Sequence, residues 1–311
     1  MPDQPRKSLD MPPRTAATPV HPRAHDGTRV HVDIESPRRD AVADYLLDGH
    51  LNTTVDRLFA DQLLADYPQL PRLALAAASW DRRAAAVMLD HGLRHFLVLG
   101  TGGLPIWAHS STLTDLHNAG ARIVVIEHDP VTQHLHDHID HGAAAGRAHV
   151  LCLSSDRHHD LALTPAVTHL LTAGAPLGIL ATGLLRPAGI RLVTILALLD
   201  SAPSGSRAAI TQLITDGPDD QDHVGASSLG ARFAEASIPL AVENRLAADQ
   251  LLGDLPHTTT VSVMSAALDQ EATSPVMRTA LLGQRDPRSS TRAQRPATER
   301  AIDVSGRRWG R

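Results

Sequence analysis

Two apolar runs separated by a glycine-rich segment most strongly constrain what this chain can fold into. The first run, Phe96–Leu99, leads directly into Gly100-Thr101-Gly102-Gly103, and the second, Ala121–Ile126, ends in Glu127-His128-Asp129-Pro130. A strand, a glycine turn, a helix and a second strand that ends in an acid are the layout of a nucleotide-binding βαβ unit. Glycines let the backbone approach a ligand closely, and a carboxylate in that place can accept hydrogen bonds from two ribose hydroxyls. The pattern therefore predicts a nucleoside-containing ligand.

The rest of the chain continues the alternation of strands and helices. Apolar runs typical of strands occur at Phe96–Leu99, Arg122–Ile126, His149–Leu153, Pro176–Thr182, Arg207–Ile214 and Thr258–Met264. Helical patterns occur at Pro37–Asp48, Thr54–Asp66, Leu73–His91, Ile106–Asn118, Pro165–Thr172, Ile190–Leu199, Leu229–Ala236 and Glu243–Leu251, and Asp129-Pro130 is typical of a helix start. This order predicts an α/β fold of the Rossmann-like type, in which helices cover both faces of a mostly parallel sheet.

Changes in composition divide the chain into segments. Residues 1–35 are rich in proline, and residues 284–311 hold eight arginines against three acids. We therefore expect a disordered tail over residues 1–35 and a basic, largely disordered tail over residues 271–311. Between them we expect an N-terminal helical extension (36–92), packed on a Rossmann-like binding domain (93–270).

The overall composition argues against several classes of partner. A net charge of −5 at pH 7 gives no reason to expect binding to nucleic acid or to a membrane surface. Cys152 is the sole cysteine, which excludes a disulfide within the chain and a cysteine-based zinc site. No apolar run reaches the length of about 18 residues that a membrane span needs, and the N-terminus lacks the apolar core of a signal peptide. We therefore expect a cytoplasmic protein.

Pro105 refines the interpretation of the glycine turn. It occupies the last position of the pattern, where dinucleotide-binding turns carry a small residue that lets the helix pack closely. The turn therefore fits a nucleoside without a diphosphate at least as well. Asp156, after the expected third strand, can accept a hydrogen bond from the exocyclic amine of a base. The alternative for Gly100–Gly103, Glu127 and Asp156 is an ordinary set of loops without a ligand.

Three histidines raise the question of a metal. His134, His138 and His141 fall on one face of the helix expected after Pro130, which is a spacing that zinc or nickel can use. They lie among acids rather than inside an apolar shell, which is typical of a solvated helix surface. We therefore expect no metal site.

From about Ser36 to Leu268 the chain resembles the actinobacterial S-adenosylmethionine-dependent methyltransferase family, which was formerly a domain of unknown function. The similarity rests on Ala43–Asn52 with the following Asp56-Arg57, on Phe96–Pro105, on Ile126–Pro130, on Asp156-Arg157, and on Pro176–Thr182 with Gly205–Ile214. The resemblance implies a class I methyltransferase fold with S-adenosylmethionine as its cofactor.

The resemblance also implies which residues surround that cofactor, namely Gly100, Thr101, Gly102, Gly103, Glu127, His128, Asp129, Asp156 and Arg157. In this arrangement Gly100–Gly103 lies along the methionine part, Glu127 holds the ribose, and His128 and Asp156 flank the adenine. Residues of the N-terminal helices would help to close the site, namely Tyr45, Asn52 and Arg57.

Some positions depart from the family pattern. The acid that precedes the glycine turn is Val98 here, an Asn-Arg pair is Ala77-Ala78, and the histidine usual after the fourth strand is Arg186. The Gly-Gly-Lys of the family is Asp48-Gly49-His50. Several of these groups ordinarily orient the cofactor or its surroundings.

We expect a methyltransferase that acts on a small-molecule acceptor by direct displacement of the methyl group from the sulfonium onto an O, N or C nucleophile. Because the sulfonium is already activated, the protein mainly supplies alignment, and no catalytic residue stands out. A non-catalytic protein of the same fold, serving as a binding or regulatory module, is the alternative that Val98, Ala77 and Ala78 favour. Pro105 disfavours a nicotinamide-dependent oxidoreductase. The acceptor and the oligomeric state are left open.

Overall fold

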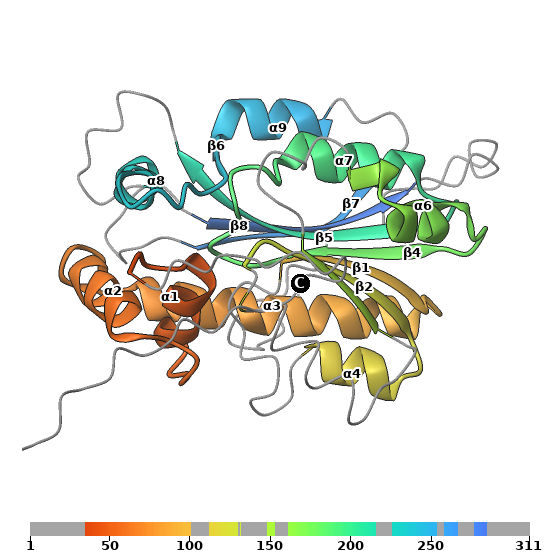
Figure 1. The fold of residues 1–311 in the computed structure, drawn as a ribbon. Helices are drawn as coiled ribbons and strands as arrows, with labels where there is room; N and C mark the ends of the chain where they lie inside the picture. Colours follow the sequence, from red (N-terminus) through yellow and green to blue (C-terminus); the bar gives the residue numbers. More distant parts are fainter. Residues whose placement is uncertain are drawn as a thin grey trace, which may run out of the picture.

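A single sheet forms the middle layer of the molecule (Figure 1). The computed structural model describes residues 35–100, 112–129, 131, 148–152, 161–215, 226–253, 258–266 and 277–284. Its strands are β1 (His95–Leu99), β2 (Arg122–Glu127), β3 (Ala148–Cys152), β4 (Leu177–Ala181), β5 (Arg207–Thr215), β6 (Val242–Asn244), β7 (Thr258–Ala266) and β8 (Met277–Gln284). They lie in the order β3-β2-β1-β4-β5-β8-β7, and β6 pairs with the end of β5.

The strand directions confirm the predicted α/β fold. Strands β1 to β5 pair in parallel with their neighbours, whereas β8 runs antiparallel between β5 and β7. The chain proceeds from β1 outward through β2 to β3 and then returns to place β4 on the other side of β1. This reversal makes the carboxyl ends of β1 and β4 a topological switch point.

Both faces of the sheet are buried under helices (Figure 1). One face carries α3 (Leu70–Asp90) and α4 (Thr112–Asn118), and the other carries α6 (Pro165–Thr172), α7 (Leu192–Ser201) and α9 (Arg245–Gly253). Because successive strand side chains point to opposite faces, Phe96 and Val98 pack towards α3 while Leu97 and Leu99 pack towards α6 and α7. Successive residues of these strands are therefore apolar, as expected for a sheet that is buried on both faces.

Gly178 shows how tightly the α3 layer meets the sheet. A Cβ added at this position in β4 would lie 2.6 Å from the ring of Phe96 and 3.0 Å from the sulfur of Met88. Only glycine leaves room for both side chains there, so this residue fixes the packing of α3 on β1 and β4.

A third apolar cluster joins the N-terminal helices to the sheet. It brings α1 (Arg39–Leu46), α2 (Thr54–Asp66) and the first turns of α3 together with α8 (Ala226–Glu235), Leu213 of β5 and the segment after β4. Phe59 of α2 and Phe233 of α8 meet edge to face with ring centroids 5.3 Å apart. These helices therefore pack near the carboxyl ends of the strands.

Strands β6 and β8 correct the predicted element boundaries. The helix expected at Glu243–Leu251 begins only at Arg245, because Val242–Asn244 pair with the end of β5 as β6. Met277–Gln284 fall inside the predicted 271–311 tail, yet they form β8 in the sheet. The sheet therefore extends past the predicted boundary at residue 270, because β8 hydrogen-bonds to both β5 and β7 there.

Candidate functional site

The carboxyl ends of β1, β2 and β4 meet at the switch point, where open α/β sheets bind their ligands. Gly100 directly follows β1, with a φ of 77° that favours glycine. Its N–H donates to the carbonyl of Ile126 in β2 at 2.8 Å, so the glycine turn begins against the end of β2. The predicted site residues Thr101, Gly102 and Gly103 lie outside the described residues.

Glu127, His128 and Asp129 follow one another at the end of β2. Glu127 is the last residue of the strand, as the sequence pattern predicted, and is only 1% exposed. His128 is half-buried and Asp129 is buried. The structure thus brings three predicted cofactor residues to the same edge as Gly100, while Asp156 and Arg157 lie outside the described residues.

Arg38 ties the N-terminal helices to this edge. Its Nη1 donates to Oδ2 of Asp129 at 3.0 Å, and its backbone N–H donates to Oδ1 of Asp56 at 2.7 Å. Asp56 is fully buried and forms a capping box with Thr53 at the start of α2. Arg38 therefore connects the cap of α2 with the end of β2. Sequence reasoning missed Arg38. The Thr53-x-x-Asp56 spacing could have indicated the cap of α2, but it does not indicate that Arg38 binds to that cap.

The predicted closing residues lie in and beside the turn between α1 and α2: Tyr45 in α1, Asn52 in the turn and Arg57 in α2. Asn52 Nδ2 donates to Oδ2 of Asp44 at 2.8 Å, and Arg57 Nη1 donates to Oδ1 of Asn52 at 3.0 Å. Tyr45 turns away and donates to Oδ1 of Asp61 at 2.9 Å. The structure therefore brings Asn52 and Arg57 together but leaves Tyr45 apart from them.

Gly49 is required by that same turn. A Cβ at Gly49 would lie 2.0 Å from Oδ1 of Asp44, whose carboxyl also accepts the N–H of Leu51 at 2.7 Å. Burial raises the pKa of Asp44, and the hydrogen bonds from Asn52 and Leu51 oppose that rise. The glycine thus gives the turn room to close around a buried carboxyl.

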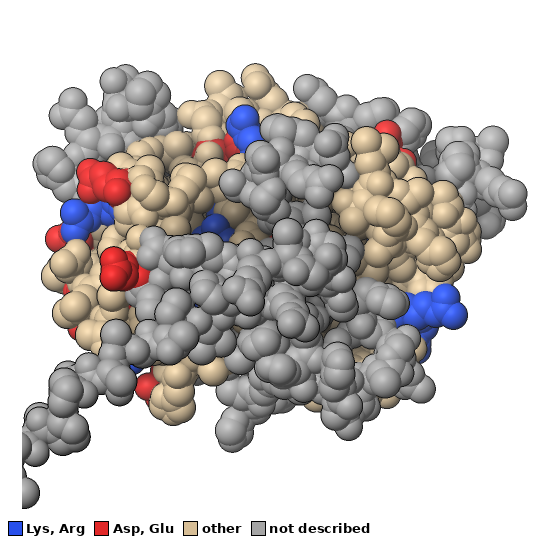
Figure 2. All heavy atoms as spheres, viewed as in Figure 1, with Lys and Arg blue, Asp and Glu red and all other residues tan. Residues whose placement is uncertain are grey.

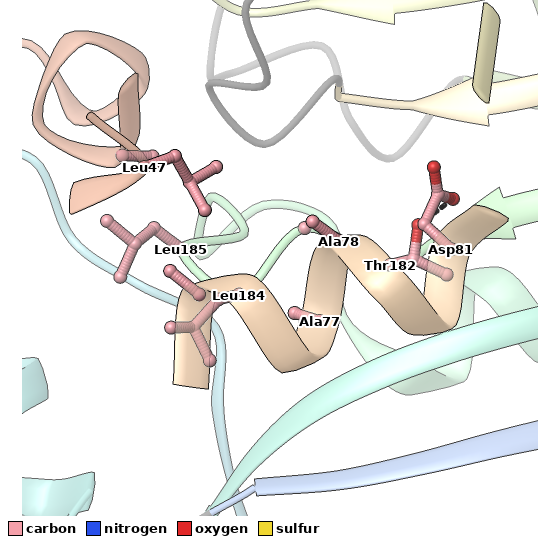
Figure 3. A pocket seen from close by; sticks show the side chains of 10 residues that line it. Leu47, Ala77, Ala78, Asp81, Thr182, Leu184 and Leu185 are labelled. Atoms are coloured by element: carbon pink, nitrogen blue, oxygen red, sulfur yellow. Dashed lines mark hydrogen bonds between the residues drawn. The ribbon is translucent and has the colours of Figure 1, made fainter. Parts of the chain in front are cut away.

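A small pocket opens beside the switch point (Figure 3). Its walls are residues of α1, α3 and the segment that follows β4, namely Ala43, Leu47, Ala74, Ala77, Ala78, Asp81, Thr182, Gly183, Leu184 and Leu185. Figure 3 shows Asp81 and Thr182 at one end and the leucines at the other. The cavity volume is about 20 Å³, which holds roughly one water-sized group.

Asp81 is the functional candidate that sequence reasoning missed. It is 6% exposed, and its carboxyl accepts hydrogen bonds from the hydroxyls of Thr182 and Thr112. Burial raises its pKa, and the two hydrogen bonds oppose that rise. A signal was present in the sequence, because Asp81 falls between Ala77 and Ala84 in the buried stripe of α3.

The positions that depart from the family pattern have different surroundings. Val98 is buried in the apolar cluster that also holds Trp80 and Ala84 of α3, and Ala77 and Ala78 line the pocket. Arg186 is buried and donates to the carbonyls of Ala181, Ile190 and Thr211 at 2.8–3.1 Å and to Gln212 Oε1. Burial lowers the pKa of Arg186 to about 10. This arginine fixes the segment between β4 and α7 from inside.

A metal centre has no support in the part of the chain that the structure describes. No group of three or more histidine, cysteine, aspartate or glutamate side chains there could hold an ion. The candidate ligands His134, His138 and His141 lie outside it. No described helix is both long and apolar enough to cross a membrane.

Comparison with known proteins decides the family. A family model described as S-adenosyl methyltransferase matches residues 25–274, which is most of the chain. The chain belongs to this family. S-adenosylmethionine is therefore its cofactor, as the resemblance implied. Among curated proteins none matches the chain.

Solved structures of similar fold agree with this family. A Thermobifida fusca protein provisionally described as a methyltransferase has 21% identity and a TM-score of 0.64, covering 82% of this chain and 97% of its own. A DUF574 family protein from Streptomyces avermitilis has 17% identity and a TM-score of 0.62, covering 82% of this chain and 100% of its own. At such identities these likenesses establish the fold alone.

The donor set at the sheet edge fits the cofactor. The ribose carries two hydroxyl donors, and Glu127 offers a buried carboxylate at the end of β2, beside the first residue of the glycine turn. On the face shown in Figure 2, the described arginine side chains stand apart from one another rather than in one basic patch.

Proposed function

We propose that this chain is an S-adenosylmethionine-dependent methyltransferase that acts on a small-molecule acceptor. When bound, the cofactor supplies a methyl group on a sulfonium that is already activated for displacement. The observation that carries the proposal is the buried carboxylate of Glu127 at the end of β2, next to Gly100. In this role Glu127 accepts both ribose hydroxyls, while the turn that begins at Gly100 follows the methionine part.

We also propose that the N-terminal helices, within residues 36–92, close the site over residues 93–270. The link through Arg38 supports this role, because it joins the cap of α2 to Asp129 beside Glu127. Asn52 and Arg57 stiffen the preceding turn through their mutual hydrogen bond. In this role the helices keep water from the edge of the sheet and so favour alignment of donor and acceptor.

Calorimetric titration of the full chain with S-adenosylmethionine and S-adenosylhomocysteine tests the proposal. Glu127→Gln should weaken both affinities by about 1–3 kcal/mol, since hydrogen bonds to a charged group are lost. Glu243→Gln is the matched control, because Glu243 is another buried glutamate but lies on β6 and contacts Arg191. Wild-type protein that binds neither ligand would overturn the proposal, and an unchanged affinity in Glu127→Gln would overturn the ribose placement.

The non-catalytic alternative is favoured by one observation. Val98 and Ala77 present only apolar side chains beside the switch point. Mass spectrometry distinguishes the two functions when it measures S-adenosylhomocysteine formed in the presence of each member of a panel of phenols, amines and carboxylic acids. Turnover of the cofactor that depends on one of these acceptors supports the enzyme, whereas tight binding without turnover on any acceptor supports the binding module.

A further inference from the structure

Asp81 has a place in the cofactor site that rests on the proposed function. Asp81 lies on α3, yet its hydrogen bonds place its carboxyl at the switch point, because Thr182 follows the last residue of β4 and Thr112 opens α4. The strand register pairs Val98 of β1 with Leu180 of β4. Continuing this register by two residues brings Thr182 level with Gly100. The carboxyl of Asp81 is therefore anchored beside the start of the glycine turn.

The charge of this carboxyl is uncompensated within the described residues. Its hydrogen-bond partners there are two neutral hydroxyls, and the rest of the pocket wall is apolar apart from Thr182. Burying a carboxylate is costly unless it is paired with a cation and hydrogen-bonded. The two threonines supply the hydrogen bonds, so the arrangement lacks only a small cationic group. The adjoining cavity of about 20 Å³ has room for one such group.

We propose that Asp81 binds the α-ammonium group of the cofactor's methionyl end. The cofactor carries two cationic groups, the ammonium and the sulfonium. A carboxylate held against the sulfonium methyl would itself be a nucleophile and would compete with the acceptor. The ammonium presents three donors and no reactive carbon, so it forms charge-assisted hydrogen bonds with Asp81 without that side reaction. In this family an acid precedes the glycine turn, but this chain has Val98 there. Asp81 thus supplies a negative charge from α3 instead of from β1.

Three ligands separate this role from others. S-adenosylmethionine carries both cations, S-adenosylhomocysteine keeps only the ammonium, and 5′-methylthioadenosine has neither an amino acid part nor a positive charge. Titration calorimetry of the full chain should show that Asp81→Asn weakens the first two by similar factors of about tenfold or more, as expected for a lost charge-assisted hydrogen bond. Binding of 5′-methylthioadenosine should stay within about twofold of wild type.

Other variants keep the test decisive. Thr182→Val removes one hydroxyl that orients the carboxyl and should weaken the same two ligands by a smaller factor. Asp81→Glu should restore part of the lost affinity. Asp115→Asn is the control, because Asp115 is an exposed carboxylate of α4 that pairs with Arg82. It should leave all three affinities unchanged. Unfolding curves show whether each variant folds. If Asp81→Asn does not fold, the affinities of Thr182→Val and Asp81→Glu test the role of Asp81.

Each remaining outcome overturns the inference. If Asp81→Asn weakened binding of S-adenosylmethionine alone, Asp81 would lie at the sulfonium. If it weakened binding of no ligand, Asp81 would have a structural role or a role on the acceptor side. Equal loss for all three ligands would indicate general damage to the site. Wild-type protein that binds none of the three would instead overturn the proposed function itself.

Discussion

Asp81 illustrates how one residue can weaken a fold while serving a site. Thr112 and Thr182 hydrogen-bond to its carboxyl, but burial dominates and raises its pKa above the ordinary value of 3.8. A carboxyl whose pKa is higher in the folded state binds its proton more tightly there than in the unfolded chain. Raising the pH through that range therefore removes stability, because the charged form is buried.

The pH dependence of unfolding tests this cost. Between pH 3.8 and the folded-state pKa, the free energy of unfolding of the wild type should fall relative to that of Asp81→Asn as the pH rises. Below that range both carry a neutral side chain, and the difference should level off. Urea unfolding of both proteins without ligand at several pH values measures it. A constant difference across these pH values would show that Asp81 has the same pKa in both states.

At the residue scale the sequence could identify Glu127 but not Asp81. Glu127 ends an apolar strand after a glycine turn, so local pattern alone indicates its place at the sheet edge. The partners of Asp81 lie 31 and 101 positions further along the chain, at Thr112 and Thr182. The stripe of α3 indicated that Asp81 is buried, but only the packing of three elements shows what its carboxyl meets.

Helix caps and side-chain hydrogen bonds between elements position the elements around the site as much as apolar stripes do. Helix α2 begins and ends where predicted, and a capping box of Thr53 and Asp56 fixes its start. Strand β6 was missed because three residues are too few to show an alternation, and Asn244 then caps α9 by accepting the N–H of Ala247 at 3.2 Å. The tie between α2 and β2 through Arg38 had no local signature at all.

Arg38→Met should loosen the N-terminal helices. The change removes the guanidinium that contacts the fully buried Asp56 and the buried Asp129, so we expect a loss of about 2 kcal/mol in the free energy of unfolding. Arg82→Met is the matched control: Arg82 pairs with Asp115 at 2.7 Å, but both side chains are exposed, so its loss should stay below about 1 kcal/mol. Chemical denaturation measures both. Equal effects would mean that Arg38 is no more than a surface ion pair.

At the scale of the whole molecule, the parallel half of the sheet follows from the sequence and the antiparallel half does not. Strands β1 to β5 alternate with helices, and this order predicts right-handed crossovers between parallel neighbours. Strand β8 instead pairs with residues 207–213, roughly seventy positions earlier in the chain. Four of its eight residues are apolar but follow no regular alternation, and the arginines after it dominate the local composition, which is why the tail was predicted to begin too early.

Truncation tests the place of β8. A chain that ends at residue 284 keeps every described strand, whereas one that ends at residue 270 loses β8 and leaves the backbone hydrogen-bonding groups of β5 and β7 unpaired. We expect the first to keep the unfolding temperature of the full chain within a few degrees and the second to aggregate or lose cooperative unfolding, because exposed strand edges are templates for association. Circular dichroism melting and size-exclusion chromatography compare the two. A chain ending at 270 that unfolds cooperatively at the temperature of the full chain would show that strands β1 to β6 are stable without β8, which joins β7 to them.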